Sequence, residues 1–292
     1  MKLAAIDIGS NAARLLITEV ENGDGLNPRF QKLNLVRVPL RLGFDVFDKG
    51  SISEEKVYML IQTLKAFRHL INAYDVTAVK TCATSAMRDA SNTKQILEIV
   101  KKETGLDIEV ISGEEEASLV FENNIAEVMN ETGQYVYIDV GGGSTEISFL
   151  KNGKRIENKS FNIGTIRLLK NGVTEYEWDE MKEYLKQSSK GQKKIFAIGS
   201  GGNINKIFSM SKKKDGKPLH IELLRSYHRE FSAFTLEERI INYSLRADRA
   251  DVIVPALLIY INAMRWAGAE EIFVPKIGLA DGLIKHLWNE LR

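Results

Sequence analysis

The sequence predicts an α/β protein with two domains. Apolar segments rich in Val and Ile alternate with longer segments of helical periodicity, which is typical of folds that alternate strands and helices. The length of 292 residues corresponds to two domains of about 150 residues each. We place the boundary at the polar segment 131–134, which gives domains 1–130 and 131–292 and leaves the last helix able to pack back on the first domain.

The first domain is expected to begin with two strands, Leu3–Asp7 and Arg14–Val20, joined by a tight Gly-Ser-Asn turn. Ser53 is expected to cap a helix that ends near residue 74, because acidic residues fill its first turn. The other expected elements are a strand at 76–83, a helix at 93–104 that Gly105 ends, a strand at 108–111 and a helix at 114–129.

The second domain is expected to repeat this opening. A strand at Tyr135–Val140 turns through three glycines and returns as Ile147–Leu150. The later elements are strands at 195–198 and 272–274, an apolar helix at about 250–266 and a closing helix from residue 281.

Composition and charge exclude several classes of protein. With 40 basic and 39 acidic residues the formal net charge is +1, so the large positive field of a dedicated nucleic-acid binder is absent. The single cysteine, Cys82, excludes a disulfide framework and a CxxC metal site. We find neither a signal-peptide core nor a run of about 18 apolar residues, and therefore expect a soluble, cytoplasmic protein with no nucleic-acid or membrane partner.

Two segments share one pattern of apolar strand, aspartate, glycine-rich turn and returning strand. They are IDIGSNAAR at 6–14 and IDVGGGSTE at 138–146, and their aspartates are 139 − 7 = 132 positions apart, about one domain length. Either the two domains are built on the same hairpin, or two ordinary hairpins are alike by chance.

The glycine-rich turns are candidate phosphate-binding sites. Three consecutive glycines, Gly141, Gly142 and Gly143, followed by Ser144 and Thr145, allow backbone N–H groups to approach an anion closely. A second turn, with Gly201 and Gly202, follows a strand and opens a helix, whose N-terminus attracts phosphate. A loose turn is the ordinary alternative for each, and neither is a P-loop or a dinucleotide fingerprint.

Acidic residues flank the first of these turns. Asp139 precedes the glycines, Glu146 starts the returning strand, and Asp7 holds the matching place in the first hairpin. Carboxylates beside phosphate need a cation between them, and Mg²⁺ suits hard oxygen ligands. Taken singly, an aspartate at the end of a strand is usually a turn residue.

Three consecutive glutamates have different expected roles. With Ser112 as N-cap, Glu115 completes a capping box and Glu114 lies in the first turn. Glu116 is left without a capping role, and its neighbours one turn on are apolar, so partial desolvation would raise its pKa and suit it to take a proton from water. A solvated acid is the alternative.

Arg88 follows a predicted strand, at the end of a sheet where ligands of α/β proteins bind. An arginine there would bind phosphate through two hydrogen bonds. A surface ion pair with Asp89 is equally consistent with the sequence.

Together these segments resemble the exopolyphosphatase and guanosine-pentaphosphatase (Ppx/GppA) family, in a short two-domain form. The segments that carry the resemblance run in family order over almost the whole chain: AIDIGSNAARLLI, TCATSAMRDASN, VISGEEEA, YIDVGGGSTEISF, NIGTIRLL, AIGSGGNINKI and RADRADVIVPA. The resemblance implies two ribonuclease-H-like lobes of the actin/Hsp70/acetate-kinase superfamily, with the active site in the cleft between them.

The resemblance also implies roles for individual residues. Glu116 matches the general base, Arg88 a phosphate-contacting arginine, and Asp139 and Glu146 the carboxylates associated with Mg²⁺. The phosphate loops are matched by Ser10 and Asn11, Gly141 to Thr145, and Gly201 and Gly202. The implied reaction is hydrolysis of a terminal phosphoanhydride.

The chain departs from the family pattern near its end. The usual Gly-Leu-Arg-Glu-Gly stands here as Gly-Leu-Ala-Asp-Gly, with Ala280 in place of the arginine. We expect an exopolyphosphatase that releases orthophosphate from inorganic polyphosphate. Hydrolysis of pppGpp at its 5′ end and a nucleotide-binding sensor with little hydrolysis remain alternatives, and homodimerisation is an expectation that the family suggests.

Overall fold

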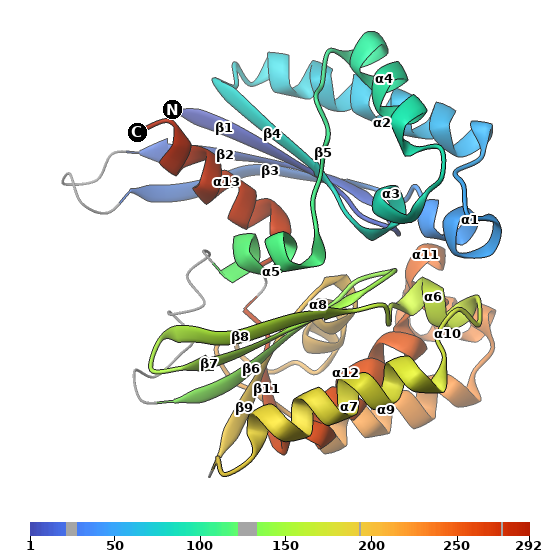
Figure 1. Ribbon diagram of the computed structural model, residues 1–292, viewed down its shortest axis with the longest axis vertical. Helices are drawn as coiled ribbons and strands as arrows, with labels where there is room; N and C mark the ends of the chain where they lie inside the picture. Colours follow the sequence, from blue (N-terminus) through green and yellow to red (C-terminus); the bar gives the residue numbers. More distant parts are fainter. Residues whose placement is uncertain (22–27, 122–132, 193, 276) are drawn as a thin grey trace. The chain divides into compact units, whose positions relative to one another are not determined.

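The computed structural model describes residues 1–21, 28–121, 133–192, 194–275 and 277–292. The chain forms two compact units (Figure 1): unit 1 comprises Met1–Asn123 and Gly278–Arg292, and unit 2 comprises Asn124–Ile277. The final helix, which the sequence analysis assigned to the second domain with the option of packing back on the first, is thus part of unit 1. The expected continuation of the helix at 114–129 lies partly outside the described residues.

Unit 1 is built on a five-stranded mixed sheet with the order β3-β2-β1-β4-β5. The first three strands form an antiparallel meander, and β4 and β5 continue it in parallel with β1. The strands are β1 (Lys2–Ile8), β2 (Ala13–Glu21), β3 (Arg29–Val38), β4 (Ala78–Ala83) and β5 (Glu109–Val110). Six consecutive residues of β1 are buried, as expected of a strand covered on both faces.

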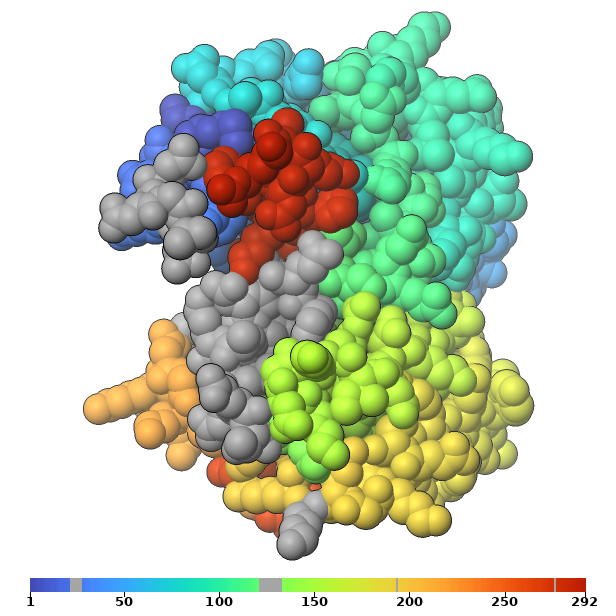
Figure 2. Space-filling model, turned by 60° about the vertical axis from the view of Figure 1, so that its left-hand side comes forward, coloured from blue at the N-terminus to red at the C-terminus, as the bar shows by residue number. Residues whose placement is uncertain are grey.

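The helices of unit 1 cover both faces of this sheet (Figure 1). They are α1 (Leu42–Lys49), α2 (Glu54–Ala73), α3 (Ser85–Asp89), α4 (Thr93–Thr104), α5 (Gly113–Phe121) and α13 (Leu279–Glu290). Helices α2 and α4 pack together, and α13 packs on β1, β2 and β4 and beside α5. In Figure 2, α13 is the red segment on the surface of unit 1. The Ser53 side chain caps α2 by accepting from the Lys56 N–H, which confirms the predicted start.

Unit 2 repeats this plan with one additional edge strand, in the order β10-β11-β9-β6-β7-β8. Its strands are β6 (Gln134–Val140), β7 (Thr145–Lys151), β8 (Lys154–Phe161), β9 (Ile195–Ser200), β10 (Leu219–His220) and β11 (Ala269–Phe273). Again β6, β7 and β8 form an antiparallel meander, and β9 and β11 run parallel to β6. The α/β class with two ribonuclease-H-like sheets is confirmed.

The helices of unit 2 pack around a central apolar helix, α12. They are α6 (Thr165–Leu169), α7 (Glu175–Ser189), α8 (Gly202–Met210), α9 (Ile221–Ala233), α10 (Leu236–Tyr243), α11 (Ala247–Ala250) and α12 (Ile253–Ala267). Helix α12 contacts α6, α7, α8, α9, β6, β9 and β11.

Among the described residues, one helical stretch, Ala247–Ala267, is long and apolar enough to cross a membrane by length and composition alone. The sequence analysis found no such run. Of its most apolar window, 61% is buried inside the protein, and its α12 part packs on both helices and strands of unit 2. Burial in the core of unit 2 accounts for its hydropathy.

Candidate functional site

The two glycine-rich hairpins have the same register. In β1–β2, Asp7 pairs with Arg14 and Ile8 with Ala13, and the Gly9 N–H donates to the Ala12 carbonyl over 3.0 Å. In β6–β7, Asp139 pairs with Glu146 and Val140 with Thr145, and the Gly141 N–H donates to the Ser144 carbonyl over 2.9 Å. Every position in the second hairpin is the first plus 132, so the repeat seen in the sequence is a repeat of structure.

The glycine loop of unit 2 is packed tightly against the start of α6. A Cβ atom on Gly164 would lie 2.4 Å from the Gly142 carbonyl oxygen and 2.4 Å from the Gly143 carbonyl carbon, so only glycine fits there. The Thr145 hydroxyl is buried and donates to the Ile163 carbonyl over 2.5 Å. Thr145 therefore fastens the loop to the segment before α6, and the backbone N–H groups of the loop are left as the groups suited to an anion.

The second glycine turn of unit 2 lies against Asp139. Gly201 has φ of 119°, and a Cβ atom there would lie 3.0 Å from the Val140 carbonyl oxygen and 3.4 Å from Asp139 Oδ1. Gly202 begins α8, whose N-terminus carries a partial positive charge. The structure thus brings together three of the predicted candidates: Asp139, the loop after β6 and the Gly201–Gly202 turn after β9.

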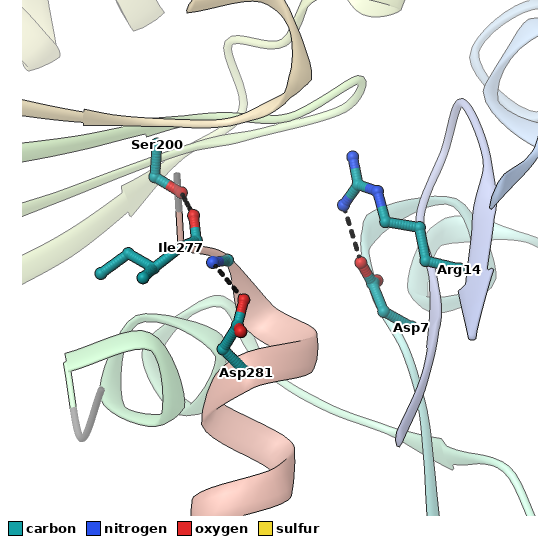
Figure 3. Close-up of polar contacts among 6 residues, drawn as sticks. Asp7, Arg14, Ser200, Ile277 and Asp281 are labelled. Carbon is teal, nitrogen blue, oxygen red and sulfur yellow. Dashed lines mark hydrogen bonds and ion pairs between the residues drawn. The ribbon is translucent and has the colours of Figure 1, made fainter. Parts of the chain in front are cut away.

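Ser200, one residue earlier, holds this turn in place. Its hydroxyl donates to the Ile277 carbonyl over 3.0 Å (Figure 3). Its own carbonyl accepts a hydrogen bond from the buried Tyr260 hydroxyl. Hydrogen bonds of both the side chain and the carbonyl of Ser200 therefore hold the turn in place.

A polar row crosses the sheet of unit 2 at the end of β6. In register it runs from Ser160 on β8 through Glu146 and Asp139 to Ser200 on β9. The Ser160 hydroxyl donates to Glu146 Oε1 over 2.9 Å, and Glu146 is 2% exposed. Two carboxylates directly opposite each other on neighbouring strands repel each other unless a cation lies between them.

The electrostatics of the surrounding residues reflect this negative charge. Burial raises the pKa of the Tyr260 hydroxyl well above its ordinary value, and the Asp139 and Glu146 charges raise it further. The same two charges add to the effect of burial on the pKa of Tyr137. Both phenols are therefore neutral, and neither offsets the charge of the two carboxylates.

The Asp139–Glu146 pair suits Mg²⁺, which takes some of its ligands from water and substrate, better than it suits a metal whose ligands all come from the protein. Among the described residues, no group of three or more His, Cys, Asp and Glu side chains is arranged to hold a metal ion. Mg²⁺ commonly binds through one or two carboxylates, water and substrate phosphates. A pair of carboxylates beside a glycine loop meets that requirement.

Asp7, the equivalent of Asp139, has a different partner. Its Oδ2 atom accepts a hydrogen bond from Arg14 Nη1 over 2.9 Å (Figure 3). Burial raises the pKa of Asp7, and the Arg14 charge opposes that rise. A metal at Asp7 would have to share the carboxylate with this guanidinium, whereas the residue paired with Asp139 across the strands is a second acid, Glu146.

The other predicted residues of unit 1 lie where β1, β4 and β5 end. The Ser10 and Ser85 hydroxyls share a buried hydrogen bond of 2.8 Å, and the Asn11 carbonyl accepts from the Arg41 N–H over 2.9 Å. Arg88, in α3, donates from Nη1 to the Ile111 carbonyl over 2.8 Å. This contact fixes the Arg88 side chain beside Ile111, the residue that precedes Ser112, the N-cap of α5.

The three glutamates of α5 are separated as predicted. The Glu115 N–H donates to the Ser112 hydroxyl over 3.1 Å, and the Ser112 N–H donates to Glu115 Oε2 over 2.7 Å, which completes the capping box. These hydrogen bonds lower the pKa of Glu115. Glu114 is exposed, whereas Glu116 is half-buried, so Glu116 is the glutamate whose surroundings differ from bulk water.

Sequence reasoning missed several residues of these sites. Arg14 was read only as the start of a strand, and its place opposite Asp7 follows from the register of the hairpin. Arg167 and Gly164, which contact the glycine loop, were quoted in the segment NIGTIRLL without a role. The Gly-Thr pair before a helix was the available signal for Gly164.

Ala280, which stands in place of the family's arginine, is buried in the first turn of α13, and the next residue, Asp281, caps that helix. The Gly278 N–H donates to Asp281 Oδ2 over 3.0 Å (Figure 3), and Asp281 Oδ1 pairs with Lys32 over 2.5 Å. Asp281 therefore stabilises the start of α13 within unit 1.

The chain is similar to known proteins along most of its length. It is 31% identical over 299 residues to the bifunctional 3-dehydroquinate synthase/phosphatase of Fusobacterium nucleatum, an alignment that covers 93% of this chain and 44% of that protein. It spans less than half the length of the curated relatives it matches.

Two solved structures cover the whole chain. The exopolyphosphatase of Cytophaga hutchinsonii has a TM-score of 0.86 and 25% identity, and covers 100% of this chain and 99% of its own. The Ppx/GppA family member of Aquifex aeolicus has a TM-score of 0.77 and 29% identity, with the same coverage. The model of the Ppx/GppA phosphatase family matches residues 16–290, and the chain belongs to this family.

Proposed function

We propose that this protein is a phosphoanhydride hydrolase that releases orthophosphate from the end of inorganic polyphosphate. The observation that carries the proposal is the group formed in unit 2 by the glycine loop, the Gly201–Gly202 turn and the Asp139–Glu146 pair. This group combines donors for phosphate oxygens with ligands for a divalent cation. A relative whose fold matches over the whole chain is an exopolyphosphatase.

In this proposal the phosphate chain binds to backbone N–H groups. Successive N–H groups of Gly142, Gly143 and Ser144 form a concave anion site. The N-terminus of α8, at Gly202, adds a second donor group with a partial positive charge. The backbone holds these donors in fixed positions, so they need no rearrangement during the reaction. They can therefore stabilise the negative charge that develops on the phosphoryl oxygens.

Asp139 and Glu146 would hold Mg²⁺. The ion, when bound, supplies positive charge that offsets the repulsion between these carboxylates and a polyanionic substrate. Ser160 orients Glu146 by donating a hydrogen bond to its Oε1 atom. Asp7 stays a candidate for a secondary metal contact that competes with Arg14.

We assign the proton transfer to Glu116. A half-buried carboxylate without a capping role can accept a proton from water more readily than Glu115, whose hydrogen bonds lower its pKa. The water oxygen then bonds to the terminal phosphorus while the bond from that phosphorus to the bridging oxygen breaks, so orthophosphate is released and the shortened chain leaves with the bridging oxygen. Arg88, fixed at one nitrogen by the Ile111 carbonyl, has its other guanidinium nitrogens for phosphate oxygens.

The same chemistry would serve pppGpp, whose 5′ end carries a phosphoanhydride. We therefore treat pppGpp hydrolysis as an outcome of the test, together with a sensor that binds a nucleotide and hydrolyses little. The cytoplasmic location and a homodimer stay predictions from the sequence.

The test measures orthophosphate release from polyphosphate and from pppGpp, with Mg²⁺ and with excess chelator, for the wild type and Glu116→Gln. We expect Mg²⁺-dependent release from polyphosphate and a loss of about 10²- to 10⁴-fold in kcat for the Gln variant. Glu114→Gln is the matched control, because Glu114 is exposed on the same helix turn. Release from neither substrate would support the sensor, and full activity of Glu116→Gln would remove Glu116 from the mechanism.

A further inference from the structure

The three carbonyls of the glycine loop all accept hydrogen bonds from the start of α6. The Gly141 carbonyl accepts from the Thr165 N–H over 3.0 Å, and the Gly142 carbonyl accepts from the Ile166 and Arg167 N–H groups over 2.8 and 3.2 Å. The Gly143 carbonyl accepts from the side chain of Arg167, through Nε, over 2.9 Å. One short segment therefore determines the orientation of three consecutive peptide groups.

These contacts fix the direction of the N–H groups of the loop. In a planar trans peptide the C=O of one residue and the N–H of the next point in opposite directions. When the carbonyls of residues 141, 142 and 143 point toward α6, the N–H groups of residues 142, 143 and 144 point away from it. Three N–H groups directed to one side are what an anion-binding nest requires.

Of the three peptide groups, the last depends on a side chain. The carbonyls of Gly141 and Gly142 are held by backbone N–H groups, whereas the carbonyl of Gly143 is held by the Arg167 guanidinium. The stem of Arg167 packs closely on Gly172, where an added Cβ would lie 3.1 Å from Arg167 Cγ. The Gly172 N–H also donates to the Arg167 carbonyl over 2.9 Å, so the arginine is itself held in place.

The first hairpin achieves the same result without a side chain. There the carbonyls of Ser10 and Asn11, equivalent to Gly142 and Gly143, accept from the N–H groups of Gly43 and Arg41 over 2.8 and 2.9 Å. Both turns therefore have hydrogen bonds that fix these two carbonyls. In unit 2, a charged side chain, that of Arg167, makes one of the two contacts.

We propose that Arg167 is a positioning residue for catalysis, which orients the Gly143–Ser144 peptide so that its N–H faces the phosphoryl oxygens. The inference rests on the proposed function of the glycine loop. A charged donor also polarises the peptide group whose carbonyl it binds, which makes the Ser144 N–H a stronger donor. Loss of the contact would affect the step in which negative charge grows at the loop more than it affects binding.

A matched pair of substitutions separates the hydrogen bond from the packing. Arg167→Gln places an N–H donor at the same number of bonds from the backbone as Nε, and Arg167→Met places a methyl group there. We expect Arg167→Met to lower kcat between about 10- and 100-fold with a change in KM below about threefold. Arg167→Gln is expected to recover at least tenfold of that loss. Arg225→Ala, on the exposed surface of α9 where Arg225 pairs with Glu222, is the control and is expected to match the wild type.

A second measurement reads the loop directly. The backbone ¹⁵N–¹H resonances of Gly143 and Ser144 should shift in Arg167→Met and stay near their wild-type positions in Arg167→Gln and Arg225→Ala. If the methionine variant does not fold, the glutamine variant decides. In that case the inference is supported if kcat of the glutamine variant stays within about tenfold of the wild type and the two resonances stay within line width of their wild-type positions. A larger loss of kcat or displaced resonances overturns it.

The outcomes distinguish this inference from the proposed function. If the wild type releases phosphate and Arg167→Met is within twofold of it, Arg167 is not a positioning residue. Equal losses in the methionine and glutamine variants would also overturn it. If the wild type hydrolyses neither polyphosphate nor pppGpp, the proposed function fails, and the resonances alone decide whether Arg167 orients the loop.

Discussion

The two hairpins of this protein share a backbone and differ in charge. At the equivalent cross-strand position, unit 1 pairs Asp7 with Arg14 and unit 2 pairs Asp139 with Glu146. The first pair is neutral, because an arginine lies 2.9 Å from the aspartate. The second is a pair of acids, whose mutual repulsion a bound cation would relieve. One residue in a repeated hairpin therefore distinguishes an ion pair from a candidate metal site.

Their turns differ in a related way. Ser10 in the first turn donates or accepts a buried hydrogen bond with Ser85, whereas its equivalent, Gly142, has no side chain and lies under the start of α6. A side-chain hydrogen bond therefore joins the tip of the first turn to α3, whereas the equivalent position in the second turn packs backbone against backbone.

The largest expected effect follows from the charge difference. Asp139→Asn should lower Mg²⁺-dependent phosphate release on the order of 10³-fold, since several kcal/mol of charge stabilisation are lost. Asp7→Asn should raise the Mg²⁺ concentration needed for half-maximal activity by less than about tenfold, because Arg14 already neutralises Asp7. The Mg²⁺ dependence of initial rates tests both. If Asp7→Asn lowered Mg²⁺-dependent phosphate release as much as Asp139→Asn, the two hairpins would be functionally equivalent, which would contradict the comparison.

The next effect concerns the glycines that pack against the two turns. Gly164→Ala should destabilise the protein by about 3 kcal/mol, because the new Cβ would meet backbone atoms that cannot move away. Gly43→Ala should cost about 1 kcal/mol, because the atoms it meets belong to the Phe47 and Ser10 side chains. Chemical denaturation measures both free energies of unfolding. A larger loss for Gly43→Ala would show that the turn of unit 1 is the more rigid one.

A smaller effect is expected for the hydroxyl pair that is found only in the first turn. Ser10→Ala leaves the Ser85 hydroxyl buried without this partner and should lower the free energy of unfolding by about 1 kcal/mol. Thr145→Val tests the hydroxyl that fastens the second turn to Ile163 and should cost a similar amount. Denaturation curves of the two variants, compared with Ser118→Ala on the half-buried face of α5, check the expectation. No change for Ser10→Ala would mean that the pair contributes nothing net.

The smallest effect is a pH dependence of stability. Burial raises the pKa of Asp7 above its ordinary value of 3.8, so the folded state binds this proton more tightly than the unfolded state. The contribution of Asp7 to stability is therefore greatest below about pH 3.8 and falls as the pH rises through the folded pKa. The free energy of unfolding of Asp7→Asn should lack this fall when both proteins are titrated upward from pH 3.5. A parallel pH profile would show that Arg14 offsets the burial completely.

Local patterns predicted much of the fold. The strands β1, β4, β6 and β9 and the helices α2, α4 and α8 follow from apolar runs, capping residues and glycine stops. The edge strands β3 and β8, RFQKLNLVRV and KRIENKSF, were missed, because polar residues interrupt them and only the last residue of β8 is buried. Their pairing with β2 and β7 makes them strands. The helices α7, α9 and α10 were likewise unassigned; few residues of α7 and α9 are buried, and none of α10 is.

The sequence by itself determined the α/β class, the repeat of the hairpin, the capping box at Ser112 and Glu115, and the residue types suited to phosphate and metal. These are properties of contiguous segments, where spacing along the chain is spacing in space. Only the tertiary structure decided that Arg14 pairs with Asp7, that Glu146 faces Asp139 across two strands and that Arg167 holds the Gly143 carbonyl. The exact register of a hairpin sets which residues of its two strands face each other, and the fold brings Arg167 to a loop 24 residues earlier in the chain. Neither relation is encoded in a local periodicity.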